Sequence, residues 1–241
     1  MQKSQDIAIL DNPAWHALKS RHTHLAIGSG PVLRYSADVS PFSAVETPDA
    51  LPELANRMTP GDVAVLWSPI DLEAPDGIEL VIRFPCLQMA AFDFRPAAVS
   101  DDAPAMGDGD AQEMVDLATL TKPGPFHLRT LRMGDYIGIR QEGRLAAMAG
   151  ERMKPEGFTE ISAICVHPDF LGRGFARRLT SIMGKRIVAD GRIPFLNVLP
   201  DNVAAISLYE SLGFTPRRMM QVHLLRKPGG DTPDDPFFKS L

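Results

Sequence analysis

The chain has 241 residues, of which 44% are hydrophobic and 23% charged, and its formal net charge is −5. The length allows one large core or two smaller ones, the acidic balance argues against nucleic-acid binding by bulk electrostatics, and no apolar run reaches the roughly 18 residues that span a bilayer. Because the two cysteines form neither a disulfide framework nor a zinc pattern and the first residues lack a signal-peptide pattern, we expect a cytoplasmic protein without a metal site.

The first 108 residues predict a small α/β domain whose role the sequence does not reveal. Asn12 is suited to cap a helix that begins at Pro13. Further elements are expected as a helix over 52–58 and strands over 32–35, 63–67 and 78–84. His22 and His24 form an H-x-H pair, but no third ligand with suitable spacing follows, so two surface or interface histidines are the better interpretation.

A stretch rich in Asp, Gly, Ala and Pro at residues 100–110 predicts a solvated linker. We therefore place a domain boundary near residue 108, a second domain over 109–227 and a loosely ordered tail over 228–241. The second domain is expected to open with a helix over 111–120. Strands over 136–140 and 145–153 flank Glu142-Gly143, which is typical of a tight hairpin turn, and a strand over 160–166 completes an antiparallel meander.

The most informative stretch joins the 160–166 strand to the next helix. His167-Pro168 ends the strand, two glycines follow, and a helical apolar pattern begins at Phe175. The first turn of a helix leaves about four backbone N–H groups without internal partners, and glycines allow these groups to close on a phosphate. The structural alternative is that the two glycines only form a tight connection between strand and helix. We predict an anion cradle for a diphosphate, formed by Leu171, Gly172, Arg173, Gly174, Phe175 and Ala176.

After this helix, residues 194–199 predict a buried strand. It should run parallel to the 160–166 strand, because a crossover helix separates the two. Asn202 is suited to cap the helix that follows, and Gly213 supplies its left-handed stop. The apolar stripe of that helix consists of Ala205, Leu208, Tyr209 and Leu212. A last strand is expected over 221–226.

From residue 111 to about 226 the chain resembles the GNAT superfamily of acyl-CoA-dependent N-acyltransferases. The resemblance rests on the strand EISAICV with His167-Pro168, on the glycine pattern that ends at Ala176, and on the segment NVAAISLYESLGF that begins at Asn202. Leu171 departs from the family, which usually has Arg or Gln there, and Arg173 is a candidate to replace the lost side-chain contact to phosphate. Within the superfamily the chain looks most like the branch of glycine N-acyltransferase-like C-terminal domains.

The resemblance implies a mixed α/β fold with a splayed mixed sheet, preceded by the smaller α/β N-terminal domain. It also implies how acetyl-CoA is bound. The diphosphate lies on the backbone amides of the cradle, and the pantetheine arm adds like a short strand beside Cys165 and Val166, in the gap where the two parallel strands separate. Asn202 is then both a helix cap and a contact to this arm.

Catalysis is expected to be direct attack of a primary amine on the thioester. Glu160 lies where other family members place a base, often acting through water, and Glu151 is the second candidate. The alternative for Glu160 is an ion pair with Arg152 or Arg178. Tyr209 keeps its proton at neutral pH and is suited to protonate the leaving thiolate, the alternative being a packing role in the helix stripe.

The predicted function is therefore N-acetyl transfer from acetyl-CoA to a primary amine, with a small molecule as the expected acceptor. A non-catalytic acyl-CoA sensor or interaction module on the same fold is the alternative. No membrane partner is expected. The residues leave open the identity of the acceptor, the acyl chain preference, the role of the first domain and the oligomeric state, for which a homodimer is one option.

Overall fold

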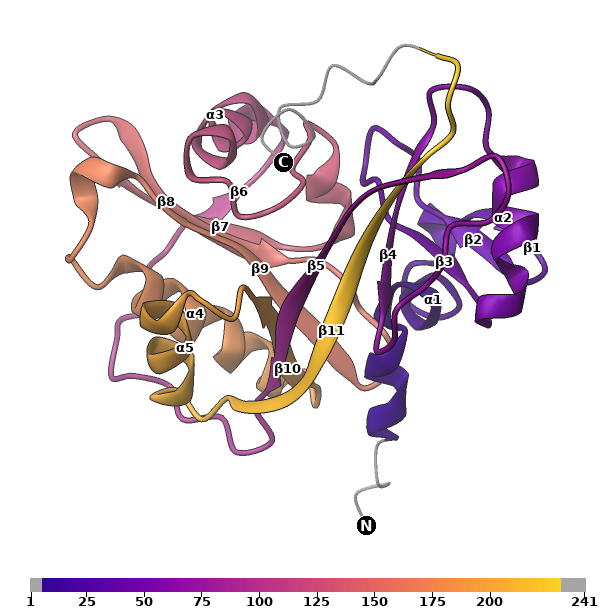
Figure 1. Cartoon of the computed structure of the whole chain (residues 1–241). Coiled ribbons are helices and arrows are strands. Elements are labelled where there is room, and N and C mark those ends of the chain that lie inside the picture. The colour runs from indigo at the N-terminus through magenta and orange to yellow at the C-terminus, as the bar shows by residue number, and fades with distance from the viewer. Residues whose placement is uncertain (1–5, 231–241) are drawn as a thin grey trace.

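The computed structural model describes residues 6–230 and shows a mixed α/β fold built on one large sheet (Figure 1). Its strand order is β4-β11-β5-β10-β9-β8-β7-β6, and a small antiparallel sheet, β1-β2-β3, lies beside it. The mixed fold with a large mixed sheet confirms the predicted fold class. The tail predicted over 228–241 falls, from residue 231 on, outside the described residues.

The elements of the large sheet are β4 (Val63–Ser68), β5 (Glu79–Ala90), β6 (Ala105–Met106), β7 (Tyr136–Gln141), β8 (Arg144–Glu151), β9 (Phe158–Val166), β10 (Ile193–Val198) and β11 (Thr215–Arg226). The small sheet consists of β1 (Ile27–Ser29), β2 (Val32–Arg34) and β3 (Ser43–Val45). The α-helices are α1 (Pro13–Leu18), α2 (Leu51–Arg57), α3 (Ala111–Thr121), α4 (Phe175–Ala189) and α5 (Val203–Glu210). Short 3-10 helices are η1 (Ile7–Asp11), η2 (Thr23–Leu25), η3 (Pro48–Ala50), η4 (Asp108–Asp110), η5 (Thr130–Met133) and η6 (Pro168–Phe170).

Local sequence signals predicted several of these elements, because the residues that cap and turn the chain lie next to the elements they shape. The side chain of Asn12 accepts a hydrogen bond from the Trp15 amide at the start of α1, and that of Asn202 accepts from the Ala205 amide at the start of α5. Glu142 and Gly143 both have positive φ between β7 and β8, as the two-residue hairpin turn requires.

The meander and the crossover are also confirmed. β7, β8 and β9 pair antiparallel, and β10 returns parallel to β9 after α4. Helix α3 covers one face of the sheet, and α4 and α5 cover the other (Figure 1). This arrangement leaves the adjoining ends of β9 and β10 between α3 and α5.

Strand β5 extends further than its sequence predicts, to Ala90 instead of Phe84, and it lies inside the sheet. It pairs with β11 along its length, whereas β10 pairs with it only from Leu87 to Ala90. Pro85, which directly follows the predicted end of the strand, lies in the part that β10 does not pair, where a missing N–H is tolerated. The predicted boundary near residue 108 therefore does not coincide with a division of the sheet, since β4 and β5 come from before it.

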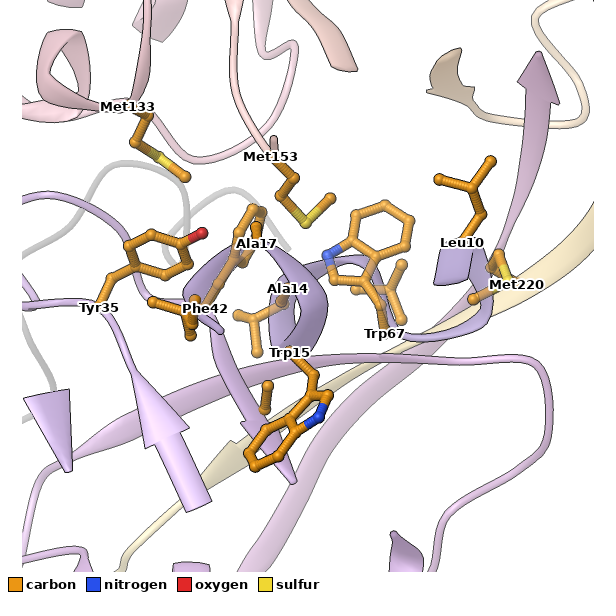
Figure 2. Packing of buried hydrophobic residues seen from close by; sticks show 14 of the residues in the cluster. Leu10, Ala14, Trp15, Ala17, Tyr35, Phe42, Trp67, Met133, Met153 and Met220 are labelled. Carbon is orange, nitrogen blue, oxygen red and sulfur yellow. The ribbon is translucent and has the colours of Figure 1, made fainter. Parts of the chain in front are cut away.

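The main hydrophobic core also joins residues from both halves of the chain. Tyr35, Phe42 and Trp67 pack with Met133 and Met153, which follow the predicted linker (Figure 2). Burying a large apolar side chain contributes about 1.5–3 kcal/mol. The first half of the chain is therefore held against the sheet by burial as well as by strand pairing.

His22 belongs to this region, and its burial corrects the surface alternative, whereas its contacts with Tyr35 and Met133, one from each half of the chain, agree with the interface alternative. Its Nδ1 lies 2.8 Å from the Tyr35 hydroxyl and its Nε2 lies 2.9 Å from the Met133 carbonyl oxygen. Because the carbonyl can only accept, Nε2 carries the proton and Nδ1 accepts from tyrosine. Burial lowers the pKa of His22 to about 3. Within residues 6–230, no group of three or more His, Cys, Asp or Glu side chains is arranged to hold a metal ion, and no helix is long and apolar enough to cross a bilayer.

Candidate active site

The parallel strands β9 and β10 separate shortly after they pair. Their register runs only from Phe158 opposite Ile193 to Glu160 opposite Phe195, and beyond this point a pocket of about 200 Å³ opens between them. The pocket is lined by Thr121, Lys122, Pro123, Arg152, Ile161, Ser162, Ala163, Ile164, Leu196, Asn197, Val198, Leu199, Asn202 and Tyr209. The predicted gap between the two parallel strands is therefore present, with α3, β9, β10 and α5 contributing to its walls.

A β-bulge shapes the wall that β9 contributes. Cys165 pairs with Met148 and Ser162 with Gly150, so two residues of β9 lie opposite one residue of β8. Ala163, inside the bulge, has a φ of 50°, which is uncommon for a residue with a Cβ and costs about 1–3 kcal/mol. The strand thus leaves regular pairing at the segment that lines the pocket. Such strain is found most often at functional sites.

The glycine turn before α4 has the open conformation that an anion cradle needs. Gly172 has a φ of 75° and Gly174 a φ of 76°, and a Cβ added at either would meet nothing within 4 Å. Gly174 is the N-cap of α4, and no side chain caps the first turn. Leu171, Gly172 and Arg173 are exposed, and Phe175 and Ala176 are half-buried. The amides at the start of this 15-residue helix are therefore accessible to an anion, which the helix dipole favours.

Two arginines flank the cradle on one aromatic ring. The guanidinium carbon of Arg173 lies 5.0 Å from the ring centroid of Phe170, and that of Arg144 lies 5.1 Å from it. Arg144 also forms an ion pair with Asp169 at 3.1 Å. Arg173 forms no ion pair within residues 6–230. Arg173 is thus available to an anion at the turn, in the role expected of it when Leu171 occupies the usual Arg or Gln position.

Cys165 and Val166, expected beside the pantetheine arm, lie just beyond the lined part of the pocket. The Cys165 side chain is buried in a cluster with α3 residues such as Met114 and Leu117, and burial raises the pKa of its thiol to about 12. Val166 pairs with Ala147 of β8 and is half-buried. The residues of β9 that line the pocket are instead Ile161–Ile164. The bulge accounts for this shift, and the sequence carries no local signal for it.

Glu160 is at the point where β9 and β10 stop pairing, and its side chain is fully buried. Arg152 donates from Nε to Oε2 at 2.9 Å and from Nη2 to Oε1 at 2.6 Å. The Met153 amide donates to Oε2 at 3.2 Å, and Asn197 Nδ2 donates to Oε1 at 2.7 Å. A carboxylate offers about four lone-pair directions, so these four donors occupy it. The geometry favours the alternative of an ion pair with Arg152 over a free base.

Arg152 is the other half of this pair. Burial alone would lower the pKa of its guanidinium, but the charge and hydrogen bonds of Glu160 outweigh burial and raise it. The guanidinium also lies 5.0 Å from the ring centroid of Phe42 and 5.8 Å from that of Trp67. Arg152 therefore connects the pocket with Phe42 and Trp67 of the main hydrophobic core. Arg178, the other partner considered for Glu160, pairs with Asp102 instead.

Glu151, the second candidate base, is not among the residues that line the pocket. Its carboxylate pairs with Lys154 and accepts a hydrogen bond from the Asp135 amide at 3.3 Å. Adjacent residues of a strand point to opposite faces, so Glu151 and Arg152 are directed apart. The pocket lining within residues 6–230 contains no acidic side chain.

Asn202 and Tyr209, both predicted, line the pocket from the N-cap of α5 and from its last turn. Tyr209 is almost fully buried, and this burial, together with the neighbouring Cys165, raises the pKa of its phenol to about 12. Its ring also packs on Phe214, with 6.0 Å between centroids. The structure thus brings Tyr209 into the pocket in a protonated form, and the packing role holds as well.

The sequence did not point to Asn197 as a site residue. It lies on β10 within IPFLNV, where it is the only polar side chain of an otherwise apolar strand. An isolated side-chain amide in a buried strand needs hydrogen-bond partners. A single polar residue in an apolar strand is therefore the sequence signal that could have identified Asn197.

Comparison with known proteins agrees with this architecture. The family described as FR47-like protein matches residues 136–222. A crystal structure of a putative acetyltransferase from the GNAT family of Novosphingobium aromaticivorans is 38% identical, with a TM-score of 0.86, over 91% of this chain and 99% of that one. A GCN5-related N-acetyltransferase from Kribbella flavida, 19% identical with a TM-score of 0.59 and covering 94% of this chain and 98% of that one, shares the fold.

Curated relatives match shorter stretches of the chain. An acetyltransferase of Yersinia enterocolitica is 49% identical over 51 residues, which are 20% of this chain and 36% of that protein. The N-alpha-acetyltransferase RimI of Mycobacterium tuberculosis is 39% identical over 83 residues, which are 33% of this chain and 51% of that protein. The chain thus spans between about a third and a half of these two relatives. The likeness to the branch of glycine N-acyltransferase-like C-terminal domains stays a prediction. The match to the Novosphingobium protein, over nearly the full length of both chains, shows that this chain belongs to the GNAT family of acetyltransferases.

Proposed function

We propose that this protein transfers an acetyl group from acetyl-CoA to a primary amine. The observation that carries the proposal is the continuity between pocket and cradle. Strand β9 borders the splayed gap and then leads through η6 directly into the open glycine turn at the start of α4. A long thioester with a diphosphate at its far end fits such a site, since one end needs an anion cradle and the other a strand-lined gap.

The residues present fit acetyl-CoA in three respects. The amides from Leu171 to Ala176 are proposed to hold the diphosphate, since the two glycines leave that space open. Arg173 is proposed to add a side-chain cation. The unpaired edge of β9, including Ile161–Ile164, is proposed to bond the amides of the arm, as an added strand would. Because Ile161–Ile164 line the pocket, the proposed site of the pantetheine arm includes these residues as well as Cys165 and Val166.

The chemical step forms a bond between the amine nitrogen and the acetyl carbon and breaks the bond between that carbon and sulfur. The nitrogen loses one proton, and the departing sulfur takes up one. Tyr209 is proposed to donate the proton to sulfur, because its phenol is protonated at neutral pH and lines the pocket. Backbone N–H groups of the β9 bulge are proposed to polarise the thioester carbonyl.

The proton lost by the amine is proposed to pass to water. Glu160 is saturated by four donors, so we assign it the role of holding Arg152 and Asn197 in place. The acceptor is proposed to be a small primary amine, because a pocket of about 200 Å³ has little room beyond the thioester end. A peptide N-terminus, in line with the N-alpha-acetyltransferase name of one relative, is the competing acceptor in the test.

The test combines binding with turnover. Acetyl-CoA binding is measured by calorimetry for the wild type, for Gly174→Trp and for Gly191→Trp. Both glycines have positive φ and open space, at opposite ends of α4. We expect Gly174→Trp to weaken binding at least about 100-fold by filling the cradle, with Gly191→Trp close to wild type. Equal affinities for all three proteins would contradict the cradle.

Turnover is followed as release of free CoA thiol with four amines: phenethylamine, spermidine, alanine amide and an alanyl tripeptide. Thiol release with at least one amine is expected. Saturable binding of acetyl-CoA without thiol release from any of the four would favour the non-catalytic sensor instead.

A further inference from the structure

The amide of Asn197 has one satisfied end and one unsatisfied end. Its Nδ2 donates to Glu160 Oε1 at 2.7 Å. Its Oδ1 is buried and has no hydrogen-bond partner within residues 6–230. The residue lines the pocket between β9 and β10. Because buried polar atoms normally have partners, this oxygen indicates that a donor is bound there in the working protein.

The orientation of this amide is imposed by its neighbours. Glu160 can only accept, and Arg152 keeps it in place with two hydrogen bonds. Rotating the Asn197 amide by half a turn would set Oδ1 against a carboxylate oxygen and break the bond from Nδ2. The carbonyl-type oxygen of this lining residue therefore stays without a partner, and rotation of the side chain cannot satisfy it.

The other hydrogen-bonding groups of the pocket make a donor the expected guest. Arg152 and Lys122 bring only donors, and the Asn202 oxygen already accepts from the Ala205 amide at 3.1 Å. The hydroxyls of Thr121, Ser162 and Tyr209 can donate or accept. Asn197 Oδ1 is thus the one side-chain carbonyl of the described lining that is left to accept. A neutral primary amine has two N–H groups and one lone pair, so it can donate one hydrogen to this oxygen and keep its lone pair for attack.

The absence of a charge on Asn197 matters for the reaction. A carboxylate at this position would stabilise an ammonium ion, which cannot attack, and it would lie beside the carboxylate of Glu160. The charges of Glu160 and Arg152 balance each other at 2.6 Å. A neutral amide oxygen orients the amine without holding it in its protonated form.

We propose that Asn197 positions the acceptor amine by accepting one N–H hydrogen at Oδ1, and that it favours primary over secondary amines. The assignment rests on the proposed acetyl transfer and adds the residue that selects the acceptor. A secondary amine has a single N–H and carries a substituent where a primary amine has its second hydrogen. Asn197 is a positioning residue, and the Glu160–Arg152 pair acts through it by setting its orientation.

The test uses the full chain with Asn197→Leu, which keeps about the same volume and removes the oxygen. Asn197→Ser, whose shorter hydroxyl does not replace the amide oxygen, is the second variant should the first not fold. Thermal melting confirms folding, and calorimetry gives the Kd of acetyl-CoA. The substrates are those amines of the four-amine screen that the wild type acetylates, with alanine amide and N-methylalanine amide as the primary and secondary pair.

We expect the KM of the amine to rise at least about tenfold, since a site that hydrogen-bonds a substrate group discriminates strongly for it. The Kd of acetyl-CoA should stay within about twofold. The preference for alanine amide over N-methylalanine amide should fall toward one, an effect that a merely structural role would not produce.

Other outcomes overturn the assignment in different ways. A Kd of acetyl-CoA raised about tenfold or more would assign the oxygen to an amide of the pantetheine arm. Unchanged values of Kd, KM and preference would assign it to bound water. If the wild-type protein binds acetyl-CoA but acetylates none of the amines, the proposed function itself is wrong, and this result is known before any variant is compared.

Discussion

Arg152 and Glu160 form a fully buried bidentate ion pair, with 2.6 Å between Nη2 and Oε1 and 2.9 Å between Nε and Oε2. The pair lies where β9 and β10 stop hydrogen-bonding to each other and where the pocket begins. The pair links Phe42 and Trp67 of the main hydrophobic core to the proposed acceptor position at Asn197. Glu160, which the sequence suggested as a catalytic base, thus has its carboxylate occupied by four donors.

Glu160→Gln tests this role through stability. The substitution preserves shape but leaves the buried Arg152 charge unbalanced, so the free energy of unfolding should fall by about 3–5 kcal/mol. Urea denaturation measures it. Glu53→Gln is the control, because Glu53 pairs with Arg57 at the surface, where an ion pair contributes about 0.5 kcal/mol. Similar small losses in both variants would show that the buried pair does not stabilise the fold.

Tyr209→Phe tests the proposed proton donor. We expect kcat to fall about 100-fold, with the Kd of acetyl-CoA unchanged because the ring still packs on Phe214. A proton donor works only while protonated, and the pKa of Tyr209 is raised to about 12 by burial. The pH profile of wild-type kcat should therefore show no fall caused by this residue up to about pH 10. An unchanged kcat in Tyr209→Phe would leave only the packing role.

His22 should make the protein less stable in mild acid. Its pKa is lowered from 6.5 to about 3, mainly by burial, so between these values the unfolded chain binds a proton that the folded chain does not. Stability therefore falls as the pH drops below 6.5, by about 2 kcal/mol between pH 7 and pH 5. Urea titrations at both pH values measure the loss. His22→Gln should remove this component, and His24→Gln, at an exposed position, should retain it. An identical pH dependence in both variants would contradict the assignment.

Gly213→Ala should destabilise the end of α5. Gly213 has a φ of +88°, and an added Cβ would lie 2.2 Å from the Asp93 carbonyl oxygen, a backbone atom that cannot move alone. Gly191→Ala shares the positive φ, at +71°, but meets open space. Overpacking typically costs about 1–3 kcal/mol, and chemical denaturation should show this difference between the two variants. Equal losses of unfolding free energy in the two variants would mean that the backbone around Asp93 moves away from the added Cβ without destabilising the fold.

Much of the second half of the chain was readable from the sequence, because its signals act over a few residues. Asn202 caps the helix that begins one residue later, Glu142 and Gly143 turn the hairpin that they connect, and Gly174 opens the helix that follows it. The parallel return of β10 follows from the single helix that crosses over between β9 and β10. These local features predicted the helices, the hairpin and the open glycine turn, whereas the gap between β9 and β10 was predicted from the family resemblance.

What the tertiary structure alone decided depends on residues far apart in the chain. The place of β5 between β10 and β11 results from pairing along edges more than 100 residues away, which no local pattern encodes. The bulge at Ala163 appears only in the register of β9 against β8. The saturation of Glu160 needs Arg152, which follows β8, and Asn197, which belongs to β10. A side chain's chemistry is set by the partners that burial brings to it, and those partners are known only once the strands are in place.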